Sequence, residues 1–187
     1  MKPPDPGVAL ILLAAGRSER FGGDKLSAIF KGQPLWTWAA QAAEEAGFRD
    51  LYIVTSPRSS IKPGARWNCV VNAEAERGMG TSIAAGIAAA QVHDRVVIAL
   101  ADMPRVPPSH LRALADATGS LFTRQPDGMA GCPAGFDKSA FEDLRQLDGD
   151  RGARILASRD AAMIAPANAD MLVDIDRKTE LDAENAR

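Results

Sequence analysis

Residues 13–25, LAAGRSERFGGDK, place glycines and cationic side chains together directly after an unbroken apolar run. The glycines are Gly16, Gly22 and Gly23, and the cations are Arg17, Arg20 and Lys25. Because glycine tolerates positive φ, the backbone N–H groups of such a loop can converge on an anion while the side chains add charge. The segment predicts a loop that holds phosphate groups, with a surface turn that happens to carry cations as the alternative.

Spacing excludes two well-known phosphate loops. The chain contains neither the Walker pattern GxxxxGK[ST] nor the dinucleotide-binding fingerprint GxGxxG. Phosphate must therefore be held by a loop of another kind.

Acidic residues follow two further apolar stretches. Asp102 comes after residues 96–100 in ALADMP, where its carboxylate could hold Mg²⁺, which accepts one or two carboxylates together with phosphate oxygens. An aspartate that forms a turn before proline is the alternative. Asp174 and Asp176 lie on opposite sides of a strand if a strand continues through both, so only one would then face the site, and the sequence leaves open which one.

Residues 77–83, RGMGTSI, place two glycines before the start of an expected helix, with Thr81 and Ser82 supplying hydroxyl groups. Free N–H groups at a helix start can bind an anion. The pattern fits either a second cradle for an anion or base, or an ordinary capped turn.

The elements that must position these residues alternate along the first half of the chain. Apolar runs indicate strands at 8–13, 51–55, 69–71 and 96–100, the first and last of them buried on both faces. Amphipathic or capped segments indicate helices from Pro34 to about Gly47, from Thr81 or Ser82 to about Gln91, and from Ser109 onward. This alternation predicts a mostly parallel, layered α/β fold.

The second half is less regular. Strand candidates lie near residues 120–123 and 171–175, and helix candidates at 138–147 and 153–159.

Composition narrows the function. The 187 residues carry 22 basic and 24 acidic side chains, a formal charge of −2 that gives no general attraction to nucleic acid or anionic membranes. Cys69 and Cys132 form no CxxC pair, and with only His93 and His110 beside them a zinc or iron–sulfur site has too few ligands.

No apolar segment reaches the 18 or more residues of a membrane span. A secretory signal is disfavoured, because Pro3, Pro4 and Pro6 interrupt the approach and cleavage near Ala15 would remove the strand that feeds the loop. A cytoplasmic protein is expected.

The opening segment resembles the motif LAxGxSxRMGxxK of the MobA-like nucleotidyltransferases, with Phe21 in place of the usual methionine. Ala15 is similar to the molybdenum cofactor cytidylyltransferases, whereas the guanylyltransferases tend to have glycine there. The resemblance spans nearly the whole chain and implies one three-layer α/β/α domain with a Rossmann-like nucleotidyltransferase fold over residues 1–187. Its nucleotide-binding part would cover about 8–125 and its acceptor-binding part about 126–187.

The resemblance also implies roles for residues of the first part. Arg20 would contact the phosphates of a nucleoside triphosphate, Lys25 would lie near its α-phosphorus, and Asp102 of the DMP motif would bind the metal. Other nucleotide contacts would come from Leu13, Ala14, Ala15, Gly16, Arg17, Ser18, Gly22, Gly80, Thr81 and Ser82. The last three belong to a segment similar to GMSTSLxxG, in which Gly80 replaces the usual serine.

In the second part, GCPAG and GDRGAR resemble segments that line the pterin side of the family. They imply acceptor contacts from Gly131, Cys132, Pro133, Asp150 and Arg151, although Ala134 and Gly135 depart from the usual pattern. For Cys132, a buried inert thiol is favoured over contact with a dithiolene sulfur. The family reads DIDTPEDL where this chain has DIDRKTEL, and Asp174 is the expected second metal ligand.

Together these features predict a magnesium-dependent cytidylyltransferase that joins CTP to a molybdopterin-type cofactor and releases pyrophosphate. The recipient of the product would be an apo-molybdoenzyme or its maturation chaperone. Alternatives are use of GTP, transfer to a sugar or polyol phosphate, and a non-catalytic carrier of the molybdenum cofactor.

Overall fold

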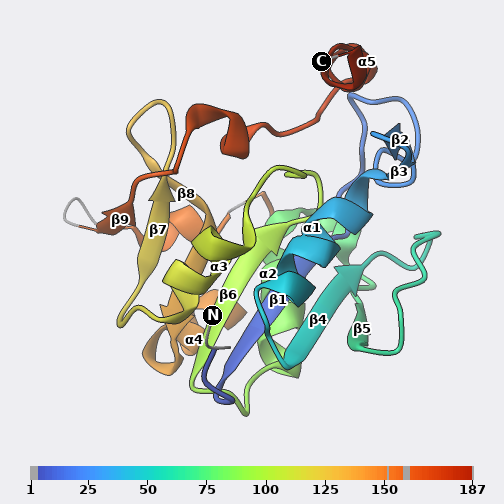
Figure 1. Ribbon diagram of the computed structural model, residues 1–187. Coiled ribbons are helices and arrows are strands. Elements are labelled where there is room, and N and C mark those ends of the chain that lie inside the picture. The colour runs from blue at the N-terminus through green and yellow to red at the C-terminus, as the bar shows by residue number, and fades with distance from the viewer. Residues whose placement is uncertain (1–3, 151, 158–160, 187) are drawn as a thin grey trace.

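The computed structural model describes residues 4–150, 152–157 and 161–186, and these form a seven-stranded sheet of order β5-β4-β1-β6-β8-β7-β9 (Figure 1). The strands are β1 (Val8–Ala14), β4 (Asp50–Thr55), β5 (Trp67–Val71), β6 (Arg95–Leu100), β7 (Leu121–Arg124), β8 (Ala130–Asp137) and β9 (Ala162–Ile164). A separate two-stranded sheet pairs β2 (Ile29–Phe30) with β3 (Gln33–Pro34).

The centre of the sheet is parallel. β1 is buried along its whole length and pairs in parallel with β4 and β6, and β4 pairs in parallel with β5. The strands expected at 8–13, 51–55, 69–71 and 96–100 are confirmed, with ends that differ by at most two residues. Since Ala14 aligns with Thr55 and Leu13 with Leu100, the loops after these three strands leave the same edge of the sheet.

Helices cover both faces of the sheet. In Figure 1, α1 (Leu35–Glu45) and α3 (Pro108–Ala115) lie in front of it, whereas α2 (Met79–Ala89) and α4 (Phe141–Arg145) lie behind it. Alternate residues of β1 pack into two separate cores: Leu10 and Leu12 pack with α1 and α3, and Ala9 and Ile11 pack with α2 and α4. The three-layer α/β/α architecture predicted from the sequence is therefore confirmed.

The second half of the sheet departs from the parallel pattern. β8 is antiparallel to both β6 and β7, and the sequence did not indicate it as a strand. Gly131, Pro133 and Gly135 lower its β-propensity. Gly135 is nevertheless required there, because a Cβ would lie 2.5 Å from Arg95 Nη2 and 2.6 Å from the Leu114 carbonyl oxygen.

Other expected elements also change. No strand forms at 171–175: a short 3₁₀ turn, Ala169–Leu172, is followed by an extended segment without strand pairing. The helix expected at 138–147 consists of a 3₁₀ turn, Lys138–Ala140, and α4, and the one at 153–159 is a 3₁₀ turn over Ala153–Leu156, with residues 158–159 outside the described ranges.

The C-terminal helix α5 (Lys178–Ala186) lies beside the β2–β3 hairpin (Figure 1), and the sequence pattern did not indicate it. Only Leu181 and Glu184 of this helix are buried, so it has too few apolar positions for a periodic signal.

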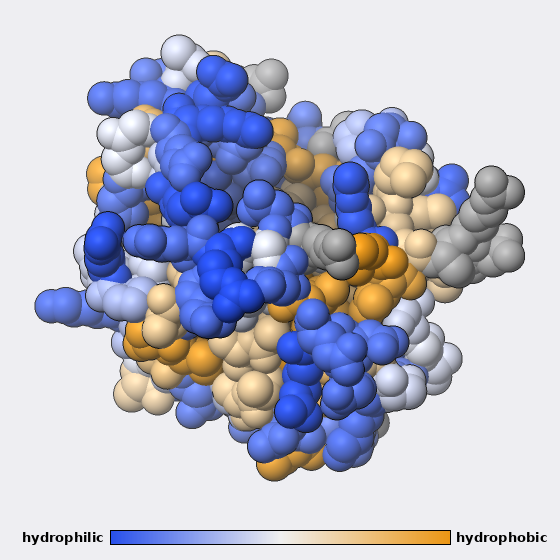
Figure 2. All heavy atoms as spheres, turned by 180° about the vertical axis from the view of Figure 1, so that it is seen from behind, coloured by the Kyte–Doolittle hydropathy of each residue, from blue (hydrophilic) through white to orange (hydrophobic). Residues whose placement is uncertain are grey.

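Among the helices of the described ranges, none combines the length and the hydrophobicity of a transmembrane span. Seen from behind, the surface is mostly hydrophilic, with orange apolar areas separated by polar side chains (Figure 2).

Candidate active site at the carboxyl edge of the sheet

A pocket of 570 Å³ opens where β1 and β6 end. It is lined by residues of the segment 13–25, called the phosphate loop below, by the start of α2, by Asp102 after β6 and by the segment before α5. Ligands of open α/β sheets bind at this edge, outside the carboxyl ends of the strands. The pocket therefore lies where the sequence predicted the site, beside the residues that follow the apolar strands β1 and β6.

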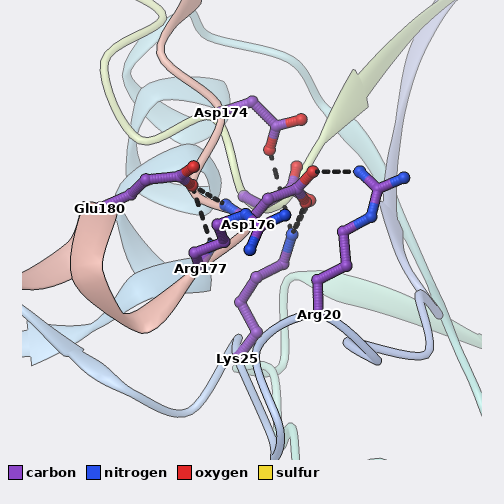
Figure 3. A network of polar contacts seen from close by, with 7 residues as sticks. Arg20, Lys25, Asp174, Asp176, Arg177 and Glu180 are labelled. Atoms are coloured by element: carbon purple, nitrogen blue, oxygen red, sulfur yellow. Dashed lines mark hydrogen bonds and ion pairs between the residues drawn. The ribbon is translucent and has the colours of Figure 1, made fainter.

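Lys25 lies at the centre of the polar network in this pocket (Figure 3). Its Nζ donates hydrogen bonds to Asp102 Oδ2 at 2.7 Å and to Asp176 Oδ1 at 2.9 Å, and Asp174 Oδ1 lies 4.0 Å away. Only 8% of the Lys25 side chain is exposed. Burial lowers the pKa of Lys25, but the three carboxylates outweigh burial and leave that pKa above its ordinary value.

The contacts of Lys25 join distant parts of the chain. Asp102 is 77 residues from it in sequence and Asp176 is 151 residues away. Sequence reasoning placed Lys25 and Asp102 at one edge, and the structure brings them into direct contact.

Asp174 and Asp176 both approach the cluster, because the segment that carries them is not a strand. The Ile175 side chain between them is fully buried, and its N–H donates to the Asp102 carbonyl oxygen at 3.2 Å. This anchor leaves a carboxylate on either side of Ile175 close to Asp102. Only one of the two carboxylates would face the site if a strand continued through both. Because no strand forms here, both can do so.

The two carboxylates differ in charge state. The Asp174 side chain is 45% exposed. The burial of the rest of it, the negative charge of Asp102 and the nearby Asp176 raise the pKa of Asp174 to about 7, although Lys25 opposes this. The hydrogen bond from Lys25 lowers the pKa of Asp176. Near neutral pH, Asp176 is thus ionised, whereas Asp174 titrates.

Arg20 and Arg17 lie further out. Arg20 Nη1 is 3.2 Å from Asp176 Oδ2, but 72% of its side chain is exposed. Arg17 lies 3.1 Å from Glu19 and 3.9 Å from Asp150. Both arginines line the pocket, where they can reach an anion more freely than Lys25 can.

The backbone of the phosphate loop is open to the solvent side. A Cβ added at Gly16, Gly22 or Gly23 would meet no atom within 4 Å. Gly22 has φ +75°, and its N–H donates to the Ser18 carbonyl oxygen at 3.2 Å, which closes the turn. Leu13, Ala15, Gly16, Arg17 and Ser18 line the pocket; Gly22 does not.

A second pocket of 760 Å³ lies against the same loop. Residues 14–19 border it together with residues 56–59 after β4 and Ala73 and Ala75 after β5. Residues 56–59 were not predicted as part of the site, although they directly follow the parallel strand β4, and that position was a usable signal.

A hydrogen-bond network joins the phosphate loop to the loop after β4. Asp24 Oδ2 accepts from Ser27 Oγ at 2.7 Å and from Ser60 Oγ at 2.6 Å. Burial raises the pKa of Asp24, but these hydrogen bonds outweigh it and lower that pKa overall. The network thus ties Asp24, which borders the second pocket, to the loop after β4.

The start of α2 has a different environment from that expected of a nucleotide cradle. Ser82 lines the first pocket, whereas Gly80 and Thr81 line neither pocket. Thr81 Oγ1 donates to the Gly78 carbonyl oxygen at 2.9 Å, and a Cβ on Gly80 would lie 2.7 Å from the Asp148 nitrogen. Nucleotide contact by Gly80 and Thr81 stays a prediction.

The residues expected to bind the acceptor divide into two groups. Asp150 lines the first pocket, whereas Gly131, Cys132 and Pro133 of β8 line neither pocket. The Cys132 carbonyl oxygen accepts from Gln125 at 3.0 Å and that of Pro133 accepts from Thr123 at 2.6 Å. Arg151 lies outside the described residues.

The carboxylates fit a divalent cation. Asp102, Asp174 and Asp176 each offer an oxygen, and these atoms lie within 4.8 Å of one another. Asp102 Oδ1 is buried and receives no hydrogen bond from the residues that the structure describes. Carboxylate oxygens are the ligands that Mg²⁺ and Mn²⁺ prefer.

Comparison with known sequences gives the class of protein. A model of the family described as "MobA-like NTP transferase domain" matches residues 10–163. The chain belongs to this family of nucleotidyltransferases, as the motifs of its first half predicted. The match includes Lys25 and Asp102 and ends before Asp174 and Asp176.

One curated relative and two solved proteins are similar over nearly their whole length. The purine catabolism protein PucB of Bacillus subtilis (strain 168) is 30% identical over an alignment of 190 positions, gaps included. The alignment covers 92% of this chain and 93% of PucB. Rv0371c of Mycobacterium tuberculosis H37Rv has a TM-score of 0.77 at 25% identity, with 96% of this chain and 98% of that chain covered.

A second structure of Rv0371c, a complex with manganese, has a TM-score of 0.71 at 22% identity, with coverage of 96% and 98%. The molybdopterin-guanine dinucleotide biosynthesis protein A of Archaeoglobus fulgidus shares the fold with a TM-score of 0.70 at 17% identity, covering 95% of this chain and 97% of that chain.

Proposed function

We propose that this chain is a magnesium-dependent cytidylyltransferase that transfers CMP from CTP to the phosphate of a molybdopterin-type cofactor and releases pyrophosphate. The observation that carries the proposal is the 2.7 Å contact between Lys25 Nζ and the Asp102 carboxylate beside an open phosphate loop. A lysine and a metal-binding carboxylate within reach of one triphosphate are what phosphoryl chemistry needs, because its catalysis is mainly positioning and charge neutralisation.

Asp102, with Asp174 or Asp176 beside it, would hold the cation. Mg²⁺ supplies charge neutralisation on phosphate oxygens when it is bound. Rv0371c, which shares this fold, was solved as a complex with manganese, and this supports the proposed use of a divalent ion.

In the proposed reaction an oxygen of the acceptor phosphate forms a bond to the α-phosphorus of CTP while the bond from that phosphorus to the bridging oxygen breaks. The bridging oxygen leaves with pyrophosphate, and the acceptor phosphate, ionised near neutral pH, needs no general base. Lys25 would neutralise charge at the α-phosphate, and Arg20 would contact the outer phosphates. The N–H groups of residues 13–18 would orient the chain of phosphates.

The two pockets suggest a division of the substrates. The first contains Lys25, Asp102 and Asp150, so we assign it to the phosphates and the acceptor. The second would take the base, since it lies across the loop from the carboxylates and is bordered by residues 56–59. Ala15 borders both pockets. We propose CTP rather than GTP because the chain is similar to the cytidylyltransferases at this position.

We also propose which part of the chain binds each substrate and where the product goes. Residues of about 8–125 would bind the nucleotide and residues of about 126–187 the acceptor. The product would pass to an apo-molybdoenzyme or its maturation chaperone in the cytoplasm. The name of PucB connects that relative to purine catabolism.

Transfer assays test the proposal. The chain is incubated with Mg²⁺, molybdopterin-type cofactor and each nucleoside triphosphate labelled at the α-phosphate, and both labelled product and pyrophosphate are measured. We expect transfer from CTP with one pyrophosphate per product, and Lys25→Ala serves as the matched control. Preference for GTP would overturn the base, transfer only to a sugar or polyol phosphate would overturn the acceptor, and cofactor binding without pyrophosphate release would indicate a carrier.

A further inference from the structure

Two of the three clustered carboxylates come from the C-terminal segment, which the family match does not reach. Asp174 and Asp176 lie just before α5, and α5 is attached to the rest of the molecule at its far end. Glu184 is buried and pairs with Arg105, and Asn185 accepts from the Lys31 N–H at 2.8 Å. The segment that carries Asp174 and Asp176 is thus followed by a helix whose last turn is held in place by contacts with the rest of the protein.

Glu180, in the first turn of α5, connects the helix to the site (Figure 3). Its Oε2 accepts hydrogen bonds from the N–H groups of Asp176 at 2.8 Å and Arg177 at 2.9 Å. These two residues directly precede the helix, and side chains in the first turn commonly bond back to such N–H groups. In the described part of the chain, the Glu180 side chain accepts hydrogen bonds from these two N–H groups and makes no hydrogen bond or ion pair with Lys25 or with a carboxylate of the cluster, so its link to the site runs through the backbone.

The position of Asp176 depends on its backbone on both sides. On one side the buried Ile175 bonds to the Asp102 carbonyl oxygen, and on the other side Glu180 holds the N–H groups of Asp176 and Arg177. The Asp176 carboxylate in turn contacts two of the three cations of the loop, Lys25 at 2.9 Å and Arg20 at 3.2 Å. Loss of the Glu180 hydrogen bonds would leave only the Ile175 anchor.

We infer that Glu180 is a positioning residue for the cation site: its two hydrogen bonds hold residues 174–176 so that their carboxylates stay aligned with Asp102. The inference rests on the proposed function for the use of a divalent ion at this cluster. A segment that samples other conformations binds its ligand more weakly, by the fraction of time that it spends in the competent one. The expected loss is roughly fivefold, the scale of one helix-capping interaction.

The experiment measures Mn²⁺ binding by EPR, without nucleotide or acceptor, for the full chain and three variants. Glu180→Met keeps the length of the side chain and removes the acceptor, Glu180→Gln keeps an acceptor oxygen and removes the charge, and Asp182→Ala removes an exposed carboxylate of the same helix. We expect about fivefold weaker binding for Glu180→Met alone. The other two variants should bind within about twofold of the unmodified chain, because both keep the hydrogen bonds.

A second measurement needs no metal. Amide exchange followed by NMR should show slow exchange at Asp176 and Arg177 in the unmodified chain and in Glu180→Gln, and faster exchange in Glu180→Met. Rapid exchange at both amides of the unmodified chain would overturn the inference even if Glu180→Met did not fold.

The outcomes separate the two proposals. Equal Mn²⁺ affinity of Glu180→Met and the unmodified chain would overturn the positioning role and leave the proposed function standing. Equal losses in Glu180→Met and Glu180→Gln would assign the effect to charge and overturn it as well. Absence of Mn²⁺ binding by the unmodified chain would overturn both the positioning role and the proposed use of a metal.

Discussion

Two glycine-bearing segments, the phosphate loop and the start of α2, look alike in sequence and differ in what fills the space beside them. A Cβ on Gly16 of the loop would meet nothing within 4 Å, whereas a Cβ on Gly80 would lie 2.7 Å from the Asp148 nitrogen. The Gly80 N–H also donates to the Gly149 carbonyl oxygen at 2.8 Å. Glycine thus makes room for a ligand in one segment and for another part of the chain in the other.

The difference extends to the segment expected to bind the acceptor. A Cβ on Gly131 would lie 2.5 Å from the Gln125 side chain, so this glycine too is in contact with the protein itself. In contrast, Asp150 reaches the pocket because Gly78 and Gly80 allow residues 148–150 to pack against the start of α2. A glycine-rich motif therefore indicates close approach, and only the structure tells whether a ligand or backbone approaches.

The largest expected effect is a difference in reactivity between the two thiols, Cys69 and Cys132. It tests whether residues 131–133 are inaccessible to ligands. Cys132 is half-buried and Cys69 is exposed. Desolvation of its thiol and the negative charge of Asp102 raise the pKa of Cys132 to about 12. At pH 8 only about one Cys132 thiol in ten thousand would be ionised, and the thiolate is the reactive form.

We therefore expect iodoacetamide to modify Cys69 and spare Cys132, with the rate at Cys132 rising about tenfold per pH unit between pH 8 and 10. Mass spectrometry of peptides measures both sites, and Cys69→Ser provides the control. Equal labelling of the two thiols at pH 8 would show that this part of β8 is open to ligands.

Removal of Lys25 should have the next largest effect and tests the chemistry assigned to the loop. Lys25→Ala deletes the buried ammonium that contacts Asp102 and Asp176, and we expect turnover to fall roughly 100- to 1,000-fold, the scale for one preorganised electrostatic partner. Arg20→Ala should have a smaller effect because the Arg20 side chain is largely exposed. Steady-state pyrophosphate release measures both, and unchanged turnover in Lys25→Ala would contradict the assignment.

Gly80→Ala tests the closed side of the comparison. The added methyl group would overlap the Asp148 backbone, and overpacking of this kind lowers the free energy of unfolding by about 1–3 kcal/mol. Urea denaturation measures the loss, and Gly16→Ala, at an open position, should leave the unfolding midpoint unchanged. If Gly80→Ala is as stable as the unmodified chain but binds CTP more weakly, Gly80 contacts the nucleotide and the closed interpretation is wrong.

Gly16→Val tests the open side of the comparison, with a smaller expected effect than Lys25→Ala. A branched side chain would extend into space that borders both pockets, so we expect CTP binding to weaken about tenfold, or about 1.4 kcal/mol, with little change in thermal stability. Calorimetric titration with CTP provides the measurement. Unaltered affinity would mean that the nucleotide does not approach the loop at this residue.

Much of the first half could be predicted from the sequence, because its strands are unbroken apolar runs and its site residues directly follow them. The placement of Lys25 and Asp102 at one edge of the sheet follows from the parallel pairing of β1 and β6, whereas their direct contact is seen only in the structure. β8 could not be predicted in the same way, since glycines and proline interrupt its pattern. The joint approach of Asp174 and Asp176 depends on a buried Ile175 and a tertiary hydrogen bond to Asp102, which leave no local signal.

The central claim is that Lys25 and Asp102 act on one metal-bound triphosphate, and Mn²⁺ binding in the presence of CTP tests it most directly. EPR titrations would compare the unmodified chain with Asp102→Asn, which keeps the size of the side chain and removes its charge. We predict at least tenfold weaker Mn²⁺ binding in the variant, because a single ligand carboxylate contributes on this scale. Equal Mn²⁺ affinity of the two proteins in the presence of CTP would contradict the claim.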